Sequence, residues 1–464
     1  MKENIREQWG TKPIGKLIIA FAIPAIVSGI MGAMYNIVDQ IFIGRSIGLL
    51  GNAATNVVFP IMTICIGISF MIGLGGSANF SLKLGSGDEH NAAYFVTNAL
   101  MMSIGMSIVL LVLMFSFFEP LLILCGSTQN VLPYASDYLR VTLYGLPLFM
   151  FSFASSHIIR ADGSPRFAMG ILITGTLINT SLDPILIFTF DMGIAGAAWA
   201  SVTSQLFTAL MSVYYFRYKF KSFPLMRDAF TVHLRVIKRI LILGITPLNA
   251  FIAMMIVQIV LNNGLIHYGG SSKYGSDIPL AVVGIVTKVN FLFFSIALGI
   301  IQGSQPIIGY NYGAKNYDRV LQALTLIMKS IFIIGLIAFS AFQLFPRELT
   351  SIFGSGSPEY YEFAERYFKI YLFLIFLVAF QPCSSNYFSA IGKPIYGVII
   401  SLSRQIFILL PLLYFLPKYF GIDGILYAGP TADFCSAVIT FSFLTREILR
   451  LRRLKSENCS LPKS

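Results

Sequence analysis

The chain has 464 residues, of which 56% are hydrophobic and only 12% are charged, and its mean hydropathy is +0.75. Soluble domains carry about 25% charged residues, so this composition excludes a soluble globular protein and indicates a polytopic membrane protein. The formal net charge of +12 is explained by basic residues that flank apolar segments, and we expect no nucleic-acid partner.

About twelve apolar segments reach the roughly 20 residues that a membrane-spanning helix needs. In chain order they cover residues 15–43, 53–83, 92–118, 133–158, 165–190, 193–217, 238–266, 279–309, 319–345, 360–389, 394–417 and 422–447. The first segment is too long for a signal peptide, and its leader contains acidic residues. We therefore predict an all-α membrane protein with twelve transmembrane helices.

The Lys and Arg residues are distributed unevenly between the two sides of these segments. If the N-terminus is inside, most of the 33 Lys and Arg residues fall in inner loops and tails, beginning with Lys2 and Arg6. The positive-inside rule then places both termini in the cytoplasm. We expect a multi-pass protein of the bacterial cytoplasmic (inner) membrane.

An internal repeat divides the chain into two halves. The stretch "SHIIRADGSPRFAMGILI" (156–173) resembles "SNYFSAIGKPIYGVIISL" (385–402), and 194–203 resembles 422–431. Several matches in the same order at nearly constant offset indicate two homologous halves. Because each half has an even number of spans, the halves share one orientation and form two parallel, pseudo-symmetric six-helix lobes.

The repeat also predicts the domain organisation. Residues 1–216 form the N-terminal lobe, 217–240 a basic cytoplasmic linker with the start of helix 7, 241–447 the C-terminal lobe, and 448–464 a cytoplasmic tail. Two parallel lobes are typical of transporters, and a duplicated scaffold without transport is the alternative.

The sequence contains none of the patterns expected of an enzyme. The four His residues are scattered without metal-ligand spacing, and the five Cys residues do not form a disulfide framework. We find no Walker motif, so ATP does not drive any uphill step within this chain. We expect no enzymatic activity, no cofactor, and no metal other than Na⁺ as a coupling ion.

Several polar side chains lie inside the spans of the first half. Asp39 lies near the outer end of the first segment, and Asp183 about two turns below the outer end of the fifth, with Asn179 one turn further in on the same face. Thr203 lies about 15 Å into the sixth segment, at a similar depth. A carboxylate in hydrocarbon costs about 3 to more than 10 kcal/mol, which favours a cation or proton site here. In the alternative interpretation, each polar group caps a kink or bonds a neighbouring backbone.

The second half lacks this arrangement. It has Lys288 in the eighth segment, Arg404 in the eleventh and Asp433 in the twelfth. Asp433 can pair with one of these bases. For Lys288 and Arg404, the sequence leaves an ion pair and a contact in the substrate cavity equally open.

Four motifs together are similar to those of one known family. They are "VDQIFIGR" in the first segment, "IRADGSPRFAMG" after the fourth, "NTSLDPILIFTFDMGIAGAAWASVTSQ" across the fifth and sixth, and "QPIIGYNYGAK" after the eighth. Over essentially its whole length the chain resembles the multidrug and toxic compound extrusion (MATE) family, in its bacterial MepA-like branch. The resemblance implies an antiporter that exports lipophilic, mostly cationic drugs and dyes in exchange for inward H⁺ or Na⁺. The alternative is an exporter or flippase of lipid-linked or polar metabolites.

The resemblance also implies roles for particular residues. Asp39, Asn179, Asp183 and Thr203 correspond to the cation- or proton-binding residues of members whose first lobe carries the ion site, and Pro24 to a proline at which the first helix bends. Carboxylates that other members use in segments 7 and 10 are absent here. The expected partners are small-molecule substrates and membrane lipids, and we expect a monomer.

Overall fold

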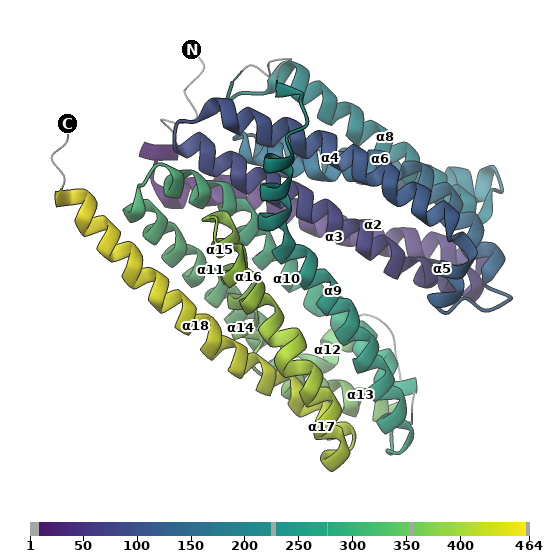
Figure 1. Cartoon of the computed structure of the whole chain (residues 1–464). Coiled ribbons are helices and arrows are strands. Elements are labelled where there is room, and N and C mark those ends of the chain that lie inside the picture. Colours follow the sequence, from purple (N-terminus) through teal and green to yellow (C-terminus); the bar gives the residue numbers. More distant parts are fainter. Residues whose placement is uncertain (1–8, 224–228, 276, 352–356, 461–464) are drawn as a thin grey trace.

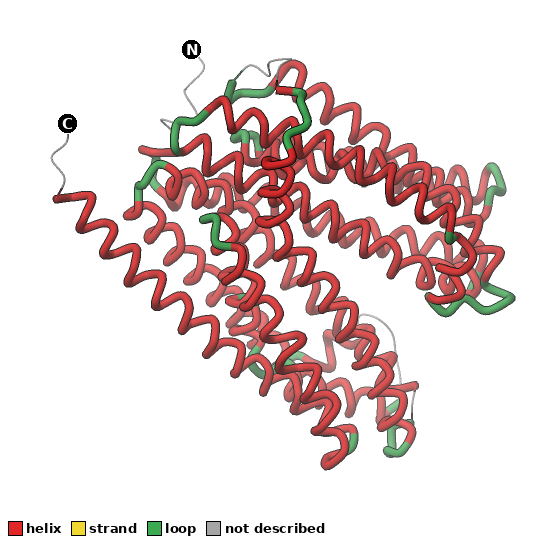
Figure 2. Tube along the Cα trace, viewed as in Figure 1, coloured by secondary structure: helices red, strands yellow, loops and turns green. Residues whose placement is uncertain are grey.

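The computed structural model describes residues 9–223, 229–275, 277–351 and 357–460. The predicted leader charges Lys2 and Arg6, residues 224–228 of the predicted linker and the last four residues of the tail lie outside the described residues. Within the described ranges the chain is helical and contains no strand (Figure 2). The predicted all-α fold class is confirmed.

The helices of the first half follow the predicted segments closely. They are α2 (Ile14–Ile47), α3 (Leu49–Gly85), α4 (Glu89–Ser116), α6 (Leu132–Ala161), α7 (Pro165–Pro184) with the π-helical turn η1 (Ile185–Thr189), and α8 (Gly193–Tyr214) with η2 (Tyr215–Lys219). A short helix that the sequence did not predict, α5 (Phe118–Leu124), connects α4 to the segment before α6.

The second half repeats this order with more interruptions. Its helices are α9 (Leu234–Gly270), α10 (Asp277–Gly313), α11 (Tyr317–Leu344), α12 (Pro346–Ser351), α13 (Pro358–Arg366), η4 (Tyr367–Tyr371), α14 (Ile375–Val378), α15 (Phe380–Ala390), α16 (Pro394–Leu402), η5 (Ser403–Leu409), α17 (Leu410–Phe420) and α18 (Ile422–Ser460). The tenth predicted segment is bent by 48° between residues 371 and 375, and the twelfth continues well beyond residue 447. Among the described helices, ten are long and apolar enough to cross a membrane, or eleven if the bent pair is one span.

The repeated Gly-x-Pro pattern has the same structural role in both halves. Gly163 and Gly392 adopt φ values of 74° and 79°, in the left-handed region that glycine enters without a Cβ clash. Pro165 and Pro394 then occupy the first turn of α7 and α16, where no intrahelical N–H donor is needed. The similarity noticed in the sequence therefore marks one turn between helices, used twice.

Figure 1 shows two helical bundles that diverge from the end of the molecule where both termini lie. We call this end the inner end and the opposite one the outer end. Close backbone contacts at the inner half hold the first lobe, α2–α8, against the second, α9–α18. A Cβ on Gly244 of α9 would lie 1.9 Å from the Met71 carbonyl oxygen of α3, and one on Gly75 would lie 2.1 Å from that of Ile240. Only glycine permits this approach.

The segment that connects the two lobes is hydrogen-bonded to the first lobe. Asp162, fully buried just after α6, accepts hydrogen bonds from the Tyr215 hydroxyl, the Lys221 and Ser222 backbone N–H groups and the Ser222 hydroxyl. Further along, the Asn98 side chain on α4 accepts from the backbone N–H of His233 at 2.9 Å. Burial raises the pKa of Asp162 to about 6, although its hydrogen bonds oppose the rise.

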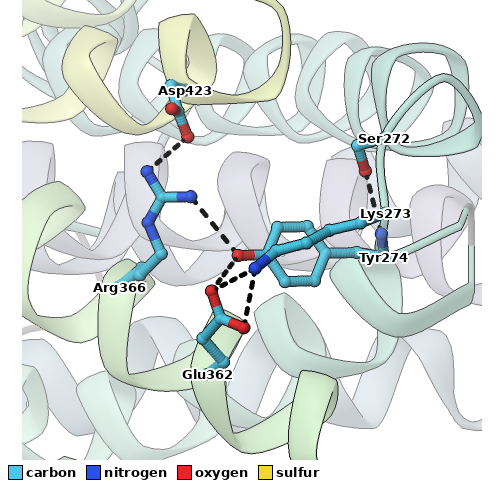
Figure 3. Close-up of polar contacts among 6 residues, drawn as sticks. All are labelled: Ser272, Lys273, Tyr274, Glu362, Arg366 and Asp423. Carbon is cyan, nitrogen blue, oxygen red and sulfur yellow. Dashed lines mark hydrogen bonds and ion pairs between the residues drawn. The ribbon is translucent and has the colours of Figure 1, made fainter.

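A polar network joins three segments at the outer end of the second lobe (Figure 3). Glu362 of α13 accepts from Lys273 at 2.6 Å and from the Tyr274 hydroxyl at 2.8 Å, both in the loop between α9 and α10. Arg366 donates to the Tyr274 hydroxyl and pairs with Asp423 of α18 at 2.7 Å. The network connects α13, the start of the bent tenth segment, to the loop between α9 and α10 and to α18.

Candidate cation site in the first lobe

The predicted acidic residues come together where α2, α7 and α8 pack against one another. Asp39 on α2 is 7% exposed, and Asn179 and Asp183 on α7 are fully buried. The two carboxylates are close enough to interact electrostatically. Asn179 and Asp183 face the same way because they are four residues apart on one helix, as the sequence predicted.

Asn179 is the centre of the hydrogen bonding in this cluster. Its Nδ2 donates to Asp183 Oδ1 at 3.3 Å and to the Ser201 hydroxyl of α8, also at 3.3 Å. The Ser201 hydroxyl in turn shares a 2.8 Å hydrogen bond with the Tyr35 hydroxyl of α2. A continuous chain of polar atoms therefore crosses the first lobe from α7 through α8 to α2.

Three oxygens in this cluster are buried acceptors that no described residue satisfies. They are Asp39 Oδ1, Asn179 Oδ1 and Asp183 Oδ2. An unsatisfied buried acceptor costs about 1–3 kcal/mol, and more when it is charged, so such groups are rare in folded proteins. Two carboxylate oxygens and an amide oxygen are suitable ligands for a proton or a small hard cation.

The structure differs from the sequence analysis at α8. Thr203 is half-buried and makes no hydrogen bond to Asp39, Asn179 or Asp183 in the described part of the chain, whereas Ser201 bonds Asn179 directly. The sequence analysis also missed Tyr35, although its position one turn before Asp39 on α2 places the two side chains on the same helix face. Tyr138 of α6 lies near both carboxylates, and nothing in the sequence pointed to it.

Pro24 lies in the inner half of α2, fifteen residues before Asp39. It leaves one carbonyl without an intrahelical donor. The Ser28 hydroxyl donates to the Pro24 carbonyl oxygen at 2.8 Å. A change in the bend of α2 at Pro24 would move Asp39 relative to α7.

The charged residues of the second lobe behave differently. Arg404, in the π-helical turn η5, donates from Nε to Asp433 Oδ1 of α18 at 2.7 Å; Asp433 is buried and Arg404 is half-buried. This pair lies within the second lobe and agrees with the ion-pair interpretation of Arg404, one of the two that the sequence left open. Lys288 on α10 is exposed and makes no ion pair with any described residue. A buried pair of fixed charges holds no exchangeable ion.

The comparisons with known proteins agree with this geometry. A family model described as MatE matches residues 24–185 and 249–415, one range in each half of the chain. The chain is similar to the multidrug export protein MepA of Staphylococcus aureus, with 24% identity over 97% of this chain and 98% of that protein. It is also similar to a protein of Shewanella oneidensis named FAD transporter, with 26% identity over 94% and 95% of the two chains.

The fold is shared with solved structures. An outward-facing structure of a multidrug resistance MATE family transporter of the MOP superfamily superposes with a TM-score of 0.89, at 23% identity, over 96% of this chain and 98% of that one. A MOP superfamily transporter from Pyrococcus furiosus gives the same TM-score at 22% identity, over the same shares of the two chains. The family consists of transporters and not of enzymes. Since the family model covers most of the chain, this protein belongs to the MatE family of membrane transporters.

Proposed function

We propose that the protein exports lipophilic, mostly cationic compounds from the cytoplasm in exchange for inward movement of H⁺ or Na⁺ through the first lobe. The observation that carries the coupling is the set of three unsatisfied buried oxygens on Asp39, Asn179 and Asp183. The similarity to a protein named for multidrug export supports the choice of substrate. The protein lies in the bacterial cytoplasmic membrane with both termini inside, and acts as a monomer.

The coupling follows from the cost of the buried charges. Two neighbouring carboxylates repel each other, and uptake of a proton or Na⁺ reduces the negative charge of the pair and with it this repulsion. The neutral and charged forms favour different positions of α2 relative to α7, with Pro24 as the bend. An ion shifts a two-state equilibrium only by such a difference in affinity.

Dye efflux from proteoliposomes tests this function. A pH gradient and a Na⁺ gradient are imposed separately, and ethidium movement is followed by fluorescence. One of the two gradients should drive ethidium uphill, and dissipating that gradient should stop export. Uphill export that persists with both gradients dissipated would contradict ion coupling.

A second candidate substrate is an aromatic anion of the flavin type. It is supported by the similarity to a protein named FAD transporter. It is also supported by Arg160, a buried base between the lobes that would repel a cation. Uphill export of flavin mononucleotide in the same vesicles, without movement of ethidium, would favour this candidate over multidrug export.

A further inference from the structure

Arg160 is a buried positive charge whose hydrogen-bond partners within the described ranges are neutral. It lies at the inner end of α6 and is 5% exposed. Its guanidinium donates to Gln302 Oε1 on α10 at 3.3 Å and to the Ser156 hydroxyl at 3.4 Å. Both distances exceed the roughly 2.7–2.9 Å of charge-assisted hydrogen bonds, so neither partner holds the guanidinium tightly.

Among the residues that the structure describes, Arg160 has no carboxylate partner. The nearest acid along the chain, Asp162, is already occupied by donors from Tyr215, Lys221 and Ser222. Two bases of the second lobe provide an internal comparison, because Arg404 pairs with Asp433 and Lys393 with Glu447. An uncompensated buried ion costs several kcal/mol, so a missing counter-charge calls for a functional reason.

A row of aromatic rings starts one helical turn from Arg160 and crosses between the two lobes. His157, one turn before Arg160 on α6, packs against Phe70 of α3 and Phe153, with ring centroids 5.3 and 5.5 Å away. Phe70 in turn packs against Phe251 of α9 at 5.0 Å. The three phenylalanine rings remain partly exposed. They offer flat apolar surface on the same interlobe seam as the Arg160 charge, with Phe153 two helical turns before Arg160 on α6.

Both the charge and the rings sit on contacts that join the lobes. The Arg160–Gln302 hydrogen bond runs from α6 to α10, and the Phe70–Phe251 contact from α3 to α9. Separation of the lobes at the inner end would break both contacts and expose the guanidinium and the ring faces to the inner side. An exporter must take up its ligand from that side.

We infer that Arg160, Gln302, Phe70, Phe153 and Phe251 form an interlobe binding site for a planar aromatic ligand that carries an anionic group such as a phosphate. The guanidinium presents several N–H donors in a plane that matches phosphate oxygens, and aromatic rings pack on one another. The inference specifies a binding site for the second candidate substrate, and it rests on the proposed export function for uptake of the ligand from the inner side. The site is separate from the cation site on α2 and α7.

Equilibrium binding of two flavins that share one ring system tests the site. Riboflavin is neutral, and riboflavin 5′-phosphate adds only the phosphate. Their fluorescence is titrated with purified protein in detergent, where no ion gradient exists. We expect the phosphate to bind at least about tenfold more tightly, since a charged hydrogen bond contributes about 1.5–3 kcal/mol.

Variants assign this preference to Arg160. R160Q should reduce the affinity for the phosphate to that for riboflavin and leave riboflavin binding unchanged. R160K keeps a charge without the planar fork and should lie between the two. R166Q removes an exposed arginine six residues further along and should behave as wild type. D183N should keep the phosphate preference, which separates this site from failure of the proposed ion coupling.

Three results would overturn the inference. They are equal affinity of the wild-type protein for both flavins, no measurable binding of either, and an unchanged phosphate preference in R160Q. If R160Q does not elute as a folded, monodisperse protein, R160K decides. A wild-type phosphate preference in folded R160K would show that the planar guanidinium is not the recognising group.

Discussion

At the scale of single residues, the cost of burying Asp39 and Asp183 explains the chemistry of the first lobe. Both carboxylates are buried, and each keeps an oxygen that no described donor satisfies. A permanent charge in this position would normally be paired, as Asp433 is with Arg404. Asp433 therefore has a basic partner, whereas no described base pairs with Asp39 or Asp183, as the proposed exchange of an ion requires.

The first prediction concerns Asp183. D183N preserves the shape of the side chain and removes the exchangeable charge, so uphill dye export from proteoliposomes should fall to the level of protein-free vesicles. D39N should do the same, and the double variant should be little worse than either, because interacting residues are not additive. D191N, at an exposed outer aspartate, is the matched control and should export normally. Normal uphill export by D183N would exclude this site.

The second prediction concerns Asp162, whose pKa is raised to about 6 by burial. Because this pKa is higher in the folded state than its ordinary value of 3.8, the folded protein binds more protons between these values. The contribution of Asp162 to stability is therefore present below about pH 4 and is lost as the pH rises through about 6, by about 3 kcal/mol in total.

The melting temperatures of wild type and D162N, compared from pH 4 to pH 7.5, measure this effect. The asparagine does not titrate, so the advantage of the wild type over D162N should shrink as the pH rises through this window. A difference that stays constant over the range would show that Asp162 does not titrate there.

At the scale of secondary-structure elements, the lobes meet through glycines on α3 and α9. Small residues let helix backbones approach closely, and side chains at the same positions would keep the helices apart. A Cβ on Gly244, 1.9 Å from the Met71 carbonyl oxygen, would have to move about 1.5 Å to reach ordinary contact distance. These glycines therefore control how tightly the inner end closes.

The third prediction follows from that contact. Gly244→Ala should increase the separation of the lobes at the inner end, measured by electron paramagnetic resonance between spin labels at positions 90 and 316. We expect a shift of the distance distribution by several ångströms, since an angular opening is amplified away from the contact. Gly284→Ala, where nothing lies within 4 Å of the added Cβ, is the control. Identical distributions for both variants would contradict a controlling role for Gly244.

At the scale of the whole molecule, the two lobes share one architecture but differ in their buried polar groups. The first contains the cluster of Asp39, Asn179 and Asp183. In the second, Asp433 is paired with Arg404, and Glu362 and Arg366 form a polar network at the outer end (Figure 3). Packing at the inner end with divergence at the outer end corresponds to an outward-facing state if both termini are cytoplasmic (Figure 1).

The fourth prediction concerns this orientation. Single cysteines at Ser86, between α3 and α4, and at Ser271, after α9, lie at exposed positions on opposite ends of the bundle. In a background without native cysteines, a membrane-impermeant maleimide should label the cysteine at position 271 on intact cells. It should label the one at position 86 only after the membrane is opened. The reverse pattern would invert the assignment of inner and outer ends.

The sequence by itself determined most of the apolar spans, the internal repeat and the shared helix face of Asn179 and Asp183. Hydrophobic length predicts a membrane helix because an unpaired backbone cannot cross hydrocarbon. Among the described helices, ten or eleven of the predicted segments are long and apolar enough to span a membrane. Helical periodicity placed Asn179 and Asp183 on one face because residues four apart lie one above the other. The bend after residue 371 was missed, since the residues at the break, YLFLI (371–375), are apolar and include neither Gly nor Pro.

Only the tertiary structure decided how the helices are rotated against one another. Ser201, and not Thr203, forms the hydrogen bond with Asn179. Residues two positions apart on a helix point about 200° away from each other, and packing selects which of them faces α7. The same limit hid Tyr138, which lies near the carboxylates from α6. It also hid Arg160, which follows the fourth predicted segment in the sequence and is buried in the fold. Periodicity orders residues along one helix, whereas contacts between helices depend on the packing of the whole bundle.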